Sequence, residues 1–381
     1  MGLIVTTIAM AGSRVSLTGG IYAYVEVAFG PYVGFLAGVL QWLTGLLAVS
    51  GVATALLDQV GALAPALGAG PVRVTILAVL FGTLAAVNAR GVRAGTRVIE
   101  TITVVKLIPL LLFVLIGVFF VNTDALVWPG LPDGTALGRS VLLLIFAYAG
   151  VEVAIAPSGE VKNPATTVPR AVFLALGITT ALYIAIQVVA QGVLGDELST
   201  YAAAPLAEAF GRLVGATGVM IMLLGAICSM FGYLSGDMLS SPRSLYALAR
   251  DGFLPSALAR IDPVRRTPAT AIWAHAVLAI IFASTGTFQS LAIISNVGML
   301  FLYLMSCGAA LELSRRDVRT DAAPFTIRGG WLWPVLGAVL VLWILSTATM
   351  RELAVTGVVL MVASGIYLGK FRWTRSGQTR L

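Results

Sequence analysis

The sequence contains little charge, little cysteine and almost no histidine, and each shortage excludes a class of protein. Charged residues make up 11% of the 381 residues and apolar residues 59%, with a mean hydropathy of +0.97. A soluble domain needs a polar surface, for which about a quarter of its residues are normally charged. We therefore expect an all-α integral membrane protein, because helices satisfy every backbone polar group in lipid.

The rare cysteine and histidine residues leave little material for metal binding or for histidine-based catalysis. Cys228 and Cys307 each stand alone in an apolar run, so they form neither a disulfide framework nor a CxxC site. His275 is the only histidine, and a lone histidine in a helix is more often a packed polar residue than a ligand. We expect no metal and no cofactor.

Long uncharged runs predict ten full membrane spans, most of them close to the ~17–25 residues that cross a bilayer. The run 267–311 is too long for one helix, and "STGTFQS" (284–290) divides it into a hairpin. The predicted spans are 33–57, 74–89, 98–121, 140–159, 171–195, 213–236, 267–284, 288–311, 329–350 and 353–369.

The positions of lysine and arginine predict which ends of the spans face the cytoplasm. With the residues before Val33 placed inside, 19 of the 24 basic residues fall in inner segments and four in outer segments. This asymmetry follows the positive-inside rule and puts the C-terminus, with a basic tail at 370–381, in the cytoplasm. The net charge of +7 thus reflects topology rather than nucleic-acid binding.

The first thirteen residues, "MGLIVTTIAMAGS", are apolar but too short to cross a membrane. Thirteen helical residues rise about 20 Å, against a hydrocarbon core of about 30 Å. A signal peptide would begin with a basic segment, which is absent. We interpret the stretch as the inner half of a span.

Four ionisable groups fall in or at the edge of the predicted spans, where each is costly unless it is paired or hydrated. Glu100 is near an inner end and is interpreted as solvated. Lys106 lies nine residues into its span, where it either snorkels to the surface or has a function. Asp237 closes an uncharged run and is either a helix-end carboxylate or a proton site. Glu152 is the fourth.

Glu152 lies in a stretch with weak helical character, "LIFAYAGVEVAIAPSGEVKNP" (144–164). Gly150 permits an unwound turn, and Pro157 and Gly159 weaken the helix further on. A broken helix at membrane depth is tolerated where it lines a cavity, and its backbone groups can hold a ligand there. Glu152 would then stabilise the unwound backbone or take part in gating. The alternative is a glycine-containing helix that packs closely against a neighbour.

Four stretches resemble the amino acid permeases of the amino acid–polyamine–organocation superfamily. "TGGIYAYVEVAFGPYVGFLAGVLQWL" (18–43) resembles the start of their third helix, and "FAYAGVEVAIAPSGEVKNPATTVPRA" (146–171) their broken sixth helix and the following inner loop. "SGDMLSSPRSLYALARDGFLP" (235–255) resembles the end of the eighth, and "SLAIISNVGMLFLYL" (290–304) extends the resemblance towards the final hairpin. The resemblance covers essentially the whole chain.

The resemblance implies two inverted five-helix repeats followed by a terminal helix pair. Residues 1–369 then form one transmembrane transporter domain. Residues 1–121 are an incomplete first repeat, 140–311 the second repeat and 329–369 the terminal pair. The chain is thus expected to hold about ten full helices plus an N-terminal half-helix, without the family's first helix. A truncated, non-transporting remnant of such a permease remains an alternative.

Substrate-binding roles follow from the resemblance only. Phe146 matches the aromatic residue that closes over bound substrate. The unwound segment corresponds to Ala147, Tyr148, Ala149 and Gly150, whose backbone would receive the substrate's amino group. Positions that face the substrate from span 33–57 correspond to Gln41, Thr44 and Gly45.

Coupling roles also follow from the resemblance. Lys106 matches a lysine whose ammonium takes the place of a sodium ion, and Asp237 lies near a substrate-facing position. Glu152 keeps the gating role that its place in the broken helix suggests. The implied mechanism is alternating access by a secondary active transporter in the cell membrane, driven by protons or by exchange. The implied partners are an amino acid or related amine, protons and membrane lipid.

The absence of an acidic pair or a pocket arginine favours a neutral amino acid as the substrate. Enzyme activity is not expected. "SGD" (235–237) is similar to the G-x-G-D motif of intramembrane aspartyl proteases, but Leu234 replaces the first glycine and no Y-D partner is present.

Overall fold

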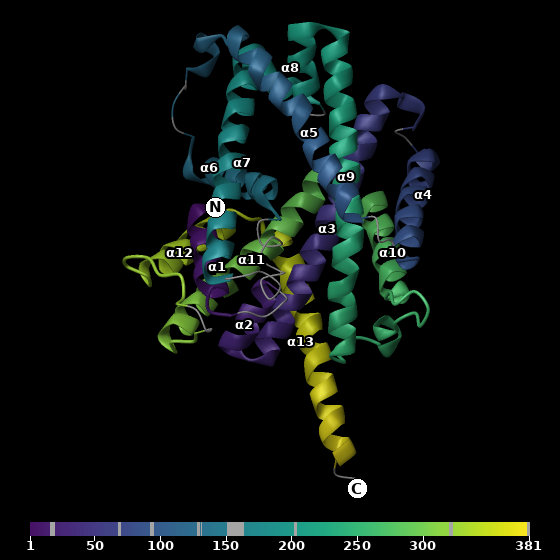
Figure 1. Ribbon diagram of the computed structural model, residues 1–381, viewed down its shortest axis with the longest axis vertical. Coiled ribbons are helices and arrows are strands. Elements are labelled where there is room, and N and C mark those ends of the chain that lie inside the picture. Colours follow the sequence, from purple (N-terminus) through teal and green to yellow (C-terminus); the bar gives the residue numbers. More distant parts are fainter. Residues whose placement is uncertain are drawn as a thin grey trace.

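The computed structural model describes residues 1–15, 20–67, 70–91, 95–127, 130, 132–150, 164–201, 204–319 and 323–378. Within these ranges all regular structure is helical (Figure 1). The α-helices are α1 (Gly2–Gly12), α2 (Ile21–Phe29), α3 (Pro31–Leu63), α4 (Gly70–Ala89), α5 (Gly95–Gly117), α6 (Gly134–Leu144), α7 (Pro164–Leu194), α8 (Pro205–Val214), α9 (Ala216–Arg250), α10 (Ala269–Thr285), α11 (Phe288–Arg315), α12 (Leu332–Ser346) and α13 (Met350–Gln378). Short 3-10 helices are η1 (Pro65–Leu67), η2 (Val118–Phe120), η3 (Thr123–Leu126), η4 (Ile145–Tyr148), η6 (Gly195–Tyr201) and η7 (Ser256–Ala259).

The helices have the length and composition of a membrane protein. In the described part of the chain, six are long and apolar enough to cross a bilayer, and five shorter apolar helices accompany them. Exposed leucine, valine and isoleucine side chains are common on their outer faces, as at Leu115, Leu174 and Val358. In water such surfaces would be a liability, whereas lipid is their natural solvent. The predicted all-α membrane fold is confirmed.

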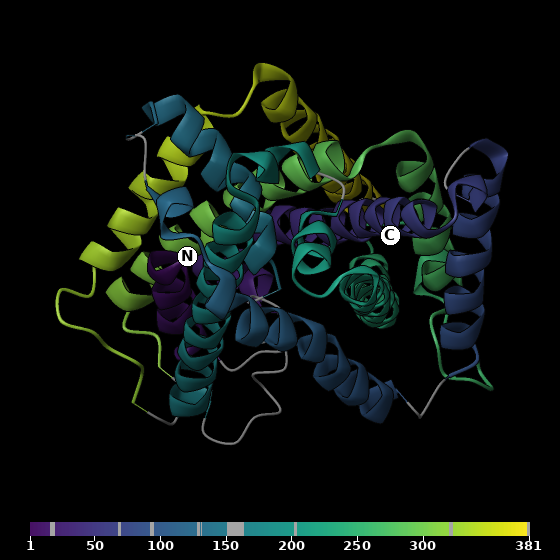
Figure 2. The same ribbon diagram turned by 90° about the horizontal axis from the view of Figure 1, so that it is seen from above.

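Two long helices, α3 and α11, form the centre of the molecule and are more buried than the helices around them. They lie against each other, with α9 on a further side of α3 (Figures 1 and 2). One apolar core joins α1, α2, α11 and α12, another joins α3, α4, α9 and α10, and a third joins α5, α7, α8 and α9. Ala37 of α3 also belongs to the first core, so α3 connects two of the three cores.

Close backbone approach at glycine allows the central contact. A Cβ atom added at Gly298 of α11 would lie 2.7 Å from the Cγ2 methyl of Thr44 on α3, which is too short for a real contact. Small residues at helix interfaces let membrane helices approach closely, and the resulting dispersion contacts stabilise the pair. The packing of α3 on α11 thus depends on Gly298.

Several helix ends differ from the sequence-based prediction. Span 33–57 continues to Leu63 as part of α3 and ends before Pro65, because a residue that precedes proline avoids the α conformation. Span 213–236 was predicted to end at the first charge, but α9 continues to Arg250 with Pro242 inside it. Of the two alternatives for Asp237, the helix-end carboxylate is therefore wrong, because the residue lies within α9. The helix continues because Asp237 has polar partners inside the bundle.

The hairpin between α10 and α11 agrees with the prediction from "STGTFQS". Helix α10 ends at Thr285 and α11 begins at Phe288. Thr287 and Ser290 form a capping box in which each side chain accepts a hydrogen bond from the other's backbone N–H. A capping box satisfies two N–H groups that the first turn of a helix leaves without partners. The turn could therefore be predicted from the sequence, because the residues that form it lie within a few positions of one another.

The N-terminal stub is a helix and is anchored at its inner end. Helix α1 is almost entirely buried and contacts α7, α11 and α12. Arg14, just beyond it, donates a 3.1 Å hydrogen bond to the carbonyl of Val318 and lies 3.8 Å from Asp317. A hydrogen bond from Arg319 lowers the pKa of the Asp317 carboxyl below its ordinary value, with a smaller contribution from Arg14.

The C-terminal end of the last helix also differs from the prediction. Residues 370–381 were predicted as a tail, whereas α13 continues without a break to Gln378 and extends past the body of the molecule (Figure 1). An aromatic group holds the earlier part of α13 against the bundle. Its Tyr367 ring stacks on Phe253, and Ser364 hydrogen-bonds the Tyr32 hydroxyl at 2.8 Å.

Candidate functional site

The first part of the predicted broken helix ends within the described residues, whereas residues 151–163, which include the rest of the predicted span, lie outside them. Helix α6 begins after the N-cap Asp133, whose carboxylate accepts hydrogen bonds from the N–H groups of Thr135 and Ala136. Its α-helical part ends at Leu144, and the chain continues as η4 into a turn at Gly150, where φ is +108°. Such a φ favours glycine, because a Cβ atom would be strained there. The helix thus ends three residues before Ala147, where the sequence predicted the unwound segment to begin.

Aromatic side chains surround this interruption. The Phe146 ring lies edge-on to Phe288 at the start of α11, with 5.5 Å between ring centroids. The Tyr183 hydroxyl of α7 donates a 2.9 Å hydrogen bond to the carbonyl of Ala147. Tyr148 packs edge-on against Tyr183 and donates to Thr180 at 3.2 Å. These contacts give the non-helical backbone partners from α7, where a continuous helix would supply them itself.

Two neighbouring residues of α11 connect the interruption to α3. Asn296 is 1% exposed, and its Nδ2 donates hydrogen bonds to the carbonyls of Leu142 at 2.7 Å and Leu143 at 3.4 Å. Ser295, next to it, donates a 2.9 Å hydrogen bond to the carbonyl of Thr44. The last carbonyls of an α-helix have no partner within it, so Asn296 caps α6 at its break.

The predicted residues of α3 face different neighbours. Thr44 is buried against α11, and its hydroxyl donates to the carbonyl of Gln41 at 3.1 Å. The Gln41 side chain is half-buried. Gly45 faces α9: a Cβ added there would lie 3.2 Å from Oγ of Ser241 and 3.7 Å from Oδ1 of Asp237. Consecutive helical positions point about 100° apart, which explains why Thr44 and Gly45 contact different helices.

Asp237 belongs to a buried aspartate–histidine cluster. Its Oδ2 lies 3.1 Å from Nε2 of His275 on α10, and Ser241 donates a 2.6 Å hydrogen bond to its Oδ1. Trp42 of α3 donates from Nε1 to Nδ1 of His275 at 3.3 Å. The Asp237 side chain is 8% exposed and the His275 side chain is fully buried. We use the name aspartate–histidine cluster for these four residues, which come from three helices.

His275 is the site residue that the sequence analysis set aside. It was treated as a packed polar residue, and it is indeed packed, but against a carboxylate. The signal was present in the sequence, because His275 stands in an otherwise uncharged predicted span and histidine is ionisable. The rule that intramembrane ionisable groups are functional candidates applies to it as it does to Asp237.

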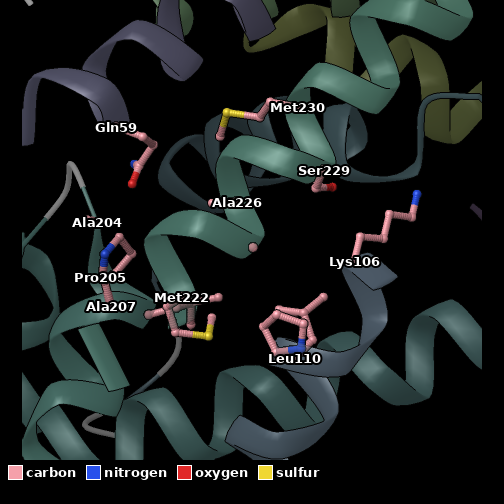
Figure 3. Close-up of a pocket in the computed structure, with 13 residues that line it drawn as sticks. Gln59, Lys106, Leu110, Ala204, Pro205, Ala207, Met222, Ala226, Ser229 and Met230 are labelled. Carbon is pink, nitrogen blue, oxygen red and sulfur yellow. The ribbon is translucent and has the colours of Figure 1, made fainter. Parts of the chain in front are cut away.

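Lys106 of α5 lines a different cavity, of about 290 Å³, between α3, α5, α8 and α9. Figure 3 shows its side chain pointing away from Gln59, with Ser229 of α9 on the same side as Lys106. Among the described residues the ammonium has no hydrogen-bond or ion-pair partner. A cation without a partner at this depth is costly, so the site is suited to an anionic or carbonyl-bearing group.

The structure thus joins the predicted residues into separate groups. The end of α6 at Leu142 is connected to Thr44 through α11, and Gly45 lies against Asp237, while Lys106 lines its own cavity. Glu152 lies outside the described residues. Within the described part of the chain, no group of three or more histidine, cysteine, aspartate or glutamate side chains is arranged to hold a metal.

Comparison with known proteins gives a consistent family assignment. A family model described as "Amino acid permease" matches residues 1–371. The serine/threonine exchanger SteT of Bacillus subtilis (strain 168) is 32% identical over 317 residues, which cover 81% of this chain and 72% of the exchanger.

Two further relatives differ in the substrates that their names state. The methylthioribose transporter of Bacillus subtilis (strain 168) is 28% identical, and the matched region covers 87% of this chain and 74% of the transporter. The branched-chain amino acid permease BcaP of Lactococcus lactis subsp. cremoris (strain MG1363) is 27% identical, and the matched region covers 83% of this chain and 72% of the permease. The similarity therefore extends over most of each protein.

Proposed function

The chain belongs to the amino acid permease family, and from this premise we propose that it is a secondary active transporter of amino acids. Transport by alternating access suits an all-α bundle with a discontinuous helix near its centre, because such helices hold substrates at mid-membrane. We propose that the chain has no enzyme activity. The family match over residues 1–371 and the transporter relatives favour this function over a non-transporting remnant.

We propose a neutral amino acid as the substrate class. Two relatives are named for serine and threonine and for branched-chain amino acids, and one is named for methylthioribose. Charged side chains are scarce around residues 146–150, since α3 carries no acidic or basic residue from Pro31 to Leu57. A charged substrate would need a compensating charge at this depth.

The observation that carries the proposal is the interruption of α6. Non-helical backbone at membrane depth is tolerated where it lines a ligand site. In the proposed site, Ala147, Tyr148, Ala149 and Gly150 offer backbone groups to the substrate, and Phe146 covers it. Gln41, Thr44 and Gly45 of α3 keep their assignment to the opposite side on the resemblance alone.

Lys106, Asp237 and Glu152 take the coupling and gating roles in this proposal. The ammonium of Lys106 is suited to bind backbone carbonyls or an anion, because no described residue neutralises it. Asp237 is suited to carry a proton, because it is buried beside a histidine. Glu152 retains its assignment to gating on its place in the predicted broken helix alone.

We propose further that the protein lies in the cell membrane with a cytoplasmic C-terminus. Support comes from the basic residues, 19 of which fall in segments that would then face the cytoplasm. Residues 1–369 would form a single transporter domain that consists of a first-repeat part at 1–121, a second repeat at 140–311 and a terminal pair at 329–369. Membrane lipid would cover its exposed apolar faces, and nucleic acid is not a proposed partner.

Uptake by purified protein in proteoliposomes tests the function. Vesicles loaded with unlabelled L-serine, L-threonine, L-valine or L-arginine are given the same labelled amino acid outside, and exchange is followed. We expect exchange of at least one neutral amino acid, inhibited by others of its class. Absence of exchange for the whole panel, with protein that is folded and inserted, would refute the proposal.

A further inference from the structure

The hydrogen bonds of the aspartate–histidine cluster assign one tautomer to a neutral His275. An indole N–H is only a donor, so Nδ1 of His275 must be the acceptor in its 3.3 Å contact with Trp42. A neutral imidazole with an acceptor at Nδ1 carries its proton at Nε2. That N–H then donates to Oδ2 of Asp237, 3.1 Å away. The tautomer follows from the hydrogen-bond network and needs an ionised or carbonyl-like oxygen at Oδ2.

The same network leaves one place where a proton can be added. A proton on Nδ1 of His275 would set its N–H against that of Trp42, and Nε2 is already occupied. Oδ1 of Asp237 accepts a 2.6 Å hydrogen bond from Ser241, whose hydroxyl can both donate and accept. If Oδ1 becomes protonated, it donates to Ser241 Oγ, and the serine hydroxyl turns to the carbonyl four residues earlier, as helical serines commonly do.

Burial supports the carboxylate as the point of entry. His275 has no exposed side-chain surface, whereas Asp237 is 8% exposed. The ionised cluster carries one uncompensated negative charge inside the α3–α4–α9–α10 core, and such a charge is costly in an apolar medium. Addition of one proton to Oδ1 removes this charge without leaving a polar atom of the cluster without a partner.

Within the described part of the chain, His275 is the only ion-pair partner of the Asp237 carboxylate. Between Pro31 and Leu57 of α3, between Val74 and Ala89 of α4 and between Phe288 and Leu311 of α11 the sequence has no acidic, basic or histidine residue. Asp58 and Arg73, at the far ends of α3 and α4, pair with each other at 2.7 Å. The remaining titratable groups on the helices packed against α9 are Arg97, Glu100 and Lys106 of α5 and Glu208 and Arg212 of α8, which pair with each other. On α9 and α10 they are Cys228, Tyr233, Arg243, Tyr246, Arg250 and His275 itself.

We propose that Asp237, with His275 held neutral by Trp42, binds and releases one proton at Oδ1 and so couples transport to protons. The coupling role rests on the proposed transport function, whereas the proton site does not depend on it. The cluster can affect the proposed substrate site, because Gly45, one of the residues assigned to that site, lies against both Ser241 and Asp237. When the Ser241 hydroxyl turns, the polar group that lies against Gly45 changes, and Gly45 is the residue next to Thr44 in α3.

Infrared difference spectroscopy of the full chain in nanodiscs tests the proton site without any substrate. A pH step should reveal the C=O stretch of a buried protonated carboxyl group that shifts in heavy water. We expect the band to be lost in Asp237→Asn and kept in the control Asp58→Asn, which removes an exposed carboxylate of the same core. A band that remains in Asp237→Asn, or the absence of any such band in the wild type, overturns the proposal.

Two further variants keep the test informative if Asp237→Asn does not fold. Ser241→Ala should shift the frequency of the band, because the protonated Oδ1 loses its acceptor. Trp42→Phe should free Nδ1 and add an imidazole signal to the titration. If neither change occurs, or if the wild type already shows an imidazolium signal, the assignment of the proton to Asp237 is wrong.

A transport measurement separates the coupling role from the transport function. Uptake of labelled L-serine into proteoliposomes is compared with and without an inward proton gradient. We expect stimulation by the gradient to be lost in Asp237→Asn, while exchange without a gradient persists, and Asp58→Asn to behave like the wild type. If the panel of amino acids fails but the infrared band behaves as expected, the transport function is refuted and the proton site stands. Gradient stimulation that survives in Asp237→Asn overturns the coupling role.

Discussion

Asn296 supports the end of α6, and its replacement should weaken both the fold and the proposed site. Leucine has a similar size and removes only the amide. In Asn296→Leu the carbonyl of Leu142 loses its 2.7 Å hydrogen bond in a buried setting, and that of Leu143 loses a longer one of 3.4 Å. A buried acceptor left without a partner costs about 1–3 kcal/mol, so we expect a loss of about 2 kcal/mol in the free energy of unfolding.

Part of this loss should appear in transport. The carbonyls of Leu142 and Leu143 precede η4 and the segment that we propose binds substrate, so their release lets this segment move. If all of the 2 kcal/mol acted on the substrate-bound state, affinity would fall by more than tenfold, since each 1.4 kcal/mol is a factor of ten. We therefore expect a KM increased several-fold up to roughly that limit, measured by exchange in proteoliposomes.

The matched control is Asn88→Leu on α4. Asn88 makes a hydrogen bond of similar length, 2.8 Å, but to the carbonyl of Leu84 in its own unbroken helix. That carbonyl keeps its backbone partner, so the change should cost little in stability and nothing in KM. Denaturant midpoints and KM are measured for both variants. Equal losses for the two, or an unchanged KM in Asn296→Leu, would refute the idea that Asn296 holds the broken helix.

Three more predictions concern the same architecture. Tyr183→Phe should raise KM roughly fivefold, because the 2.9 Å hydrogen bond to the Ala147 carbonyl is worth about 1 kcal/mol; Tyr32→Phe, which removes a 2.8 Å contact far from α6, is the control and should leave KM unchanged. Lys106→Ala should abolish uptake while expression and insertion stay at wild-type levels, and normal uptake by this variant would remove the lysine from the coupling machinery. A C-terminal reporter that is active only in the cytoplasm should be active here, and a signal from the outer side would overturn the proposed sidedness.

Local signals in the sequence predicted local structure well. The run of uncharged residues from 74 to 89 became α4, and "STGTFQS" became the turn between α10 and α11. Gly150 marked the interruption of α6, because only glycine adopts its φ of +108° without strain. Each of these features depends on residues within a few positions of one another, so no knowledge of distant contacts was needed.

The errors occurred where a distant partner changes the cost of a polar group. The prediction ended a span at Asp237 because an isolated carboxylate is costly in a membrane. His275, 38 residues later, is its partner, and α9 continues to Arg250. The α-helical end of α6 at Leu144 likewise depends on Asn296, whose amide donates a hydrogen bond to the carbonyl of Leu142 from 154 residues away in the sequence.

Composition, hydrophobic runs and the placement of basic residues were enough to determine that this chain is a helical membrane protein, and its motifs were enough for the family. These properties follow from the lipid that surrounds the helices, because lipid favours apolar side chains and backbones whose polar groups are hydrogen-bonded. Each segment meets both requirements largely through its own residues. The tertiary structure alone decided that Thr44 and Gly45 face different helices, that Lys106 lines a cavity without a partner among the described residues, and that Asp237 meets His275. Those facts depend on how helices far apart in the sequence approach each other, and on which polar groups then lie within hydrogen-bonding distance.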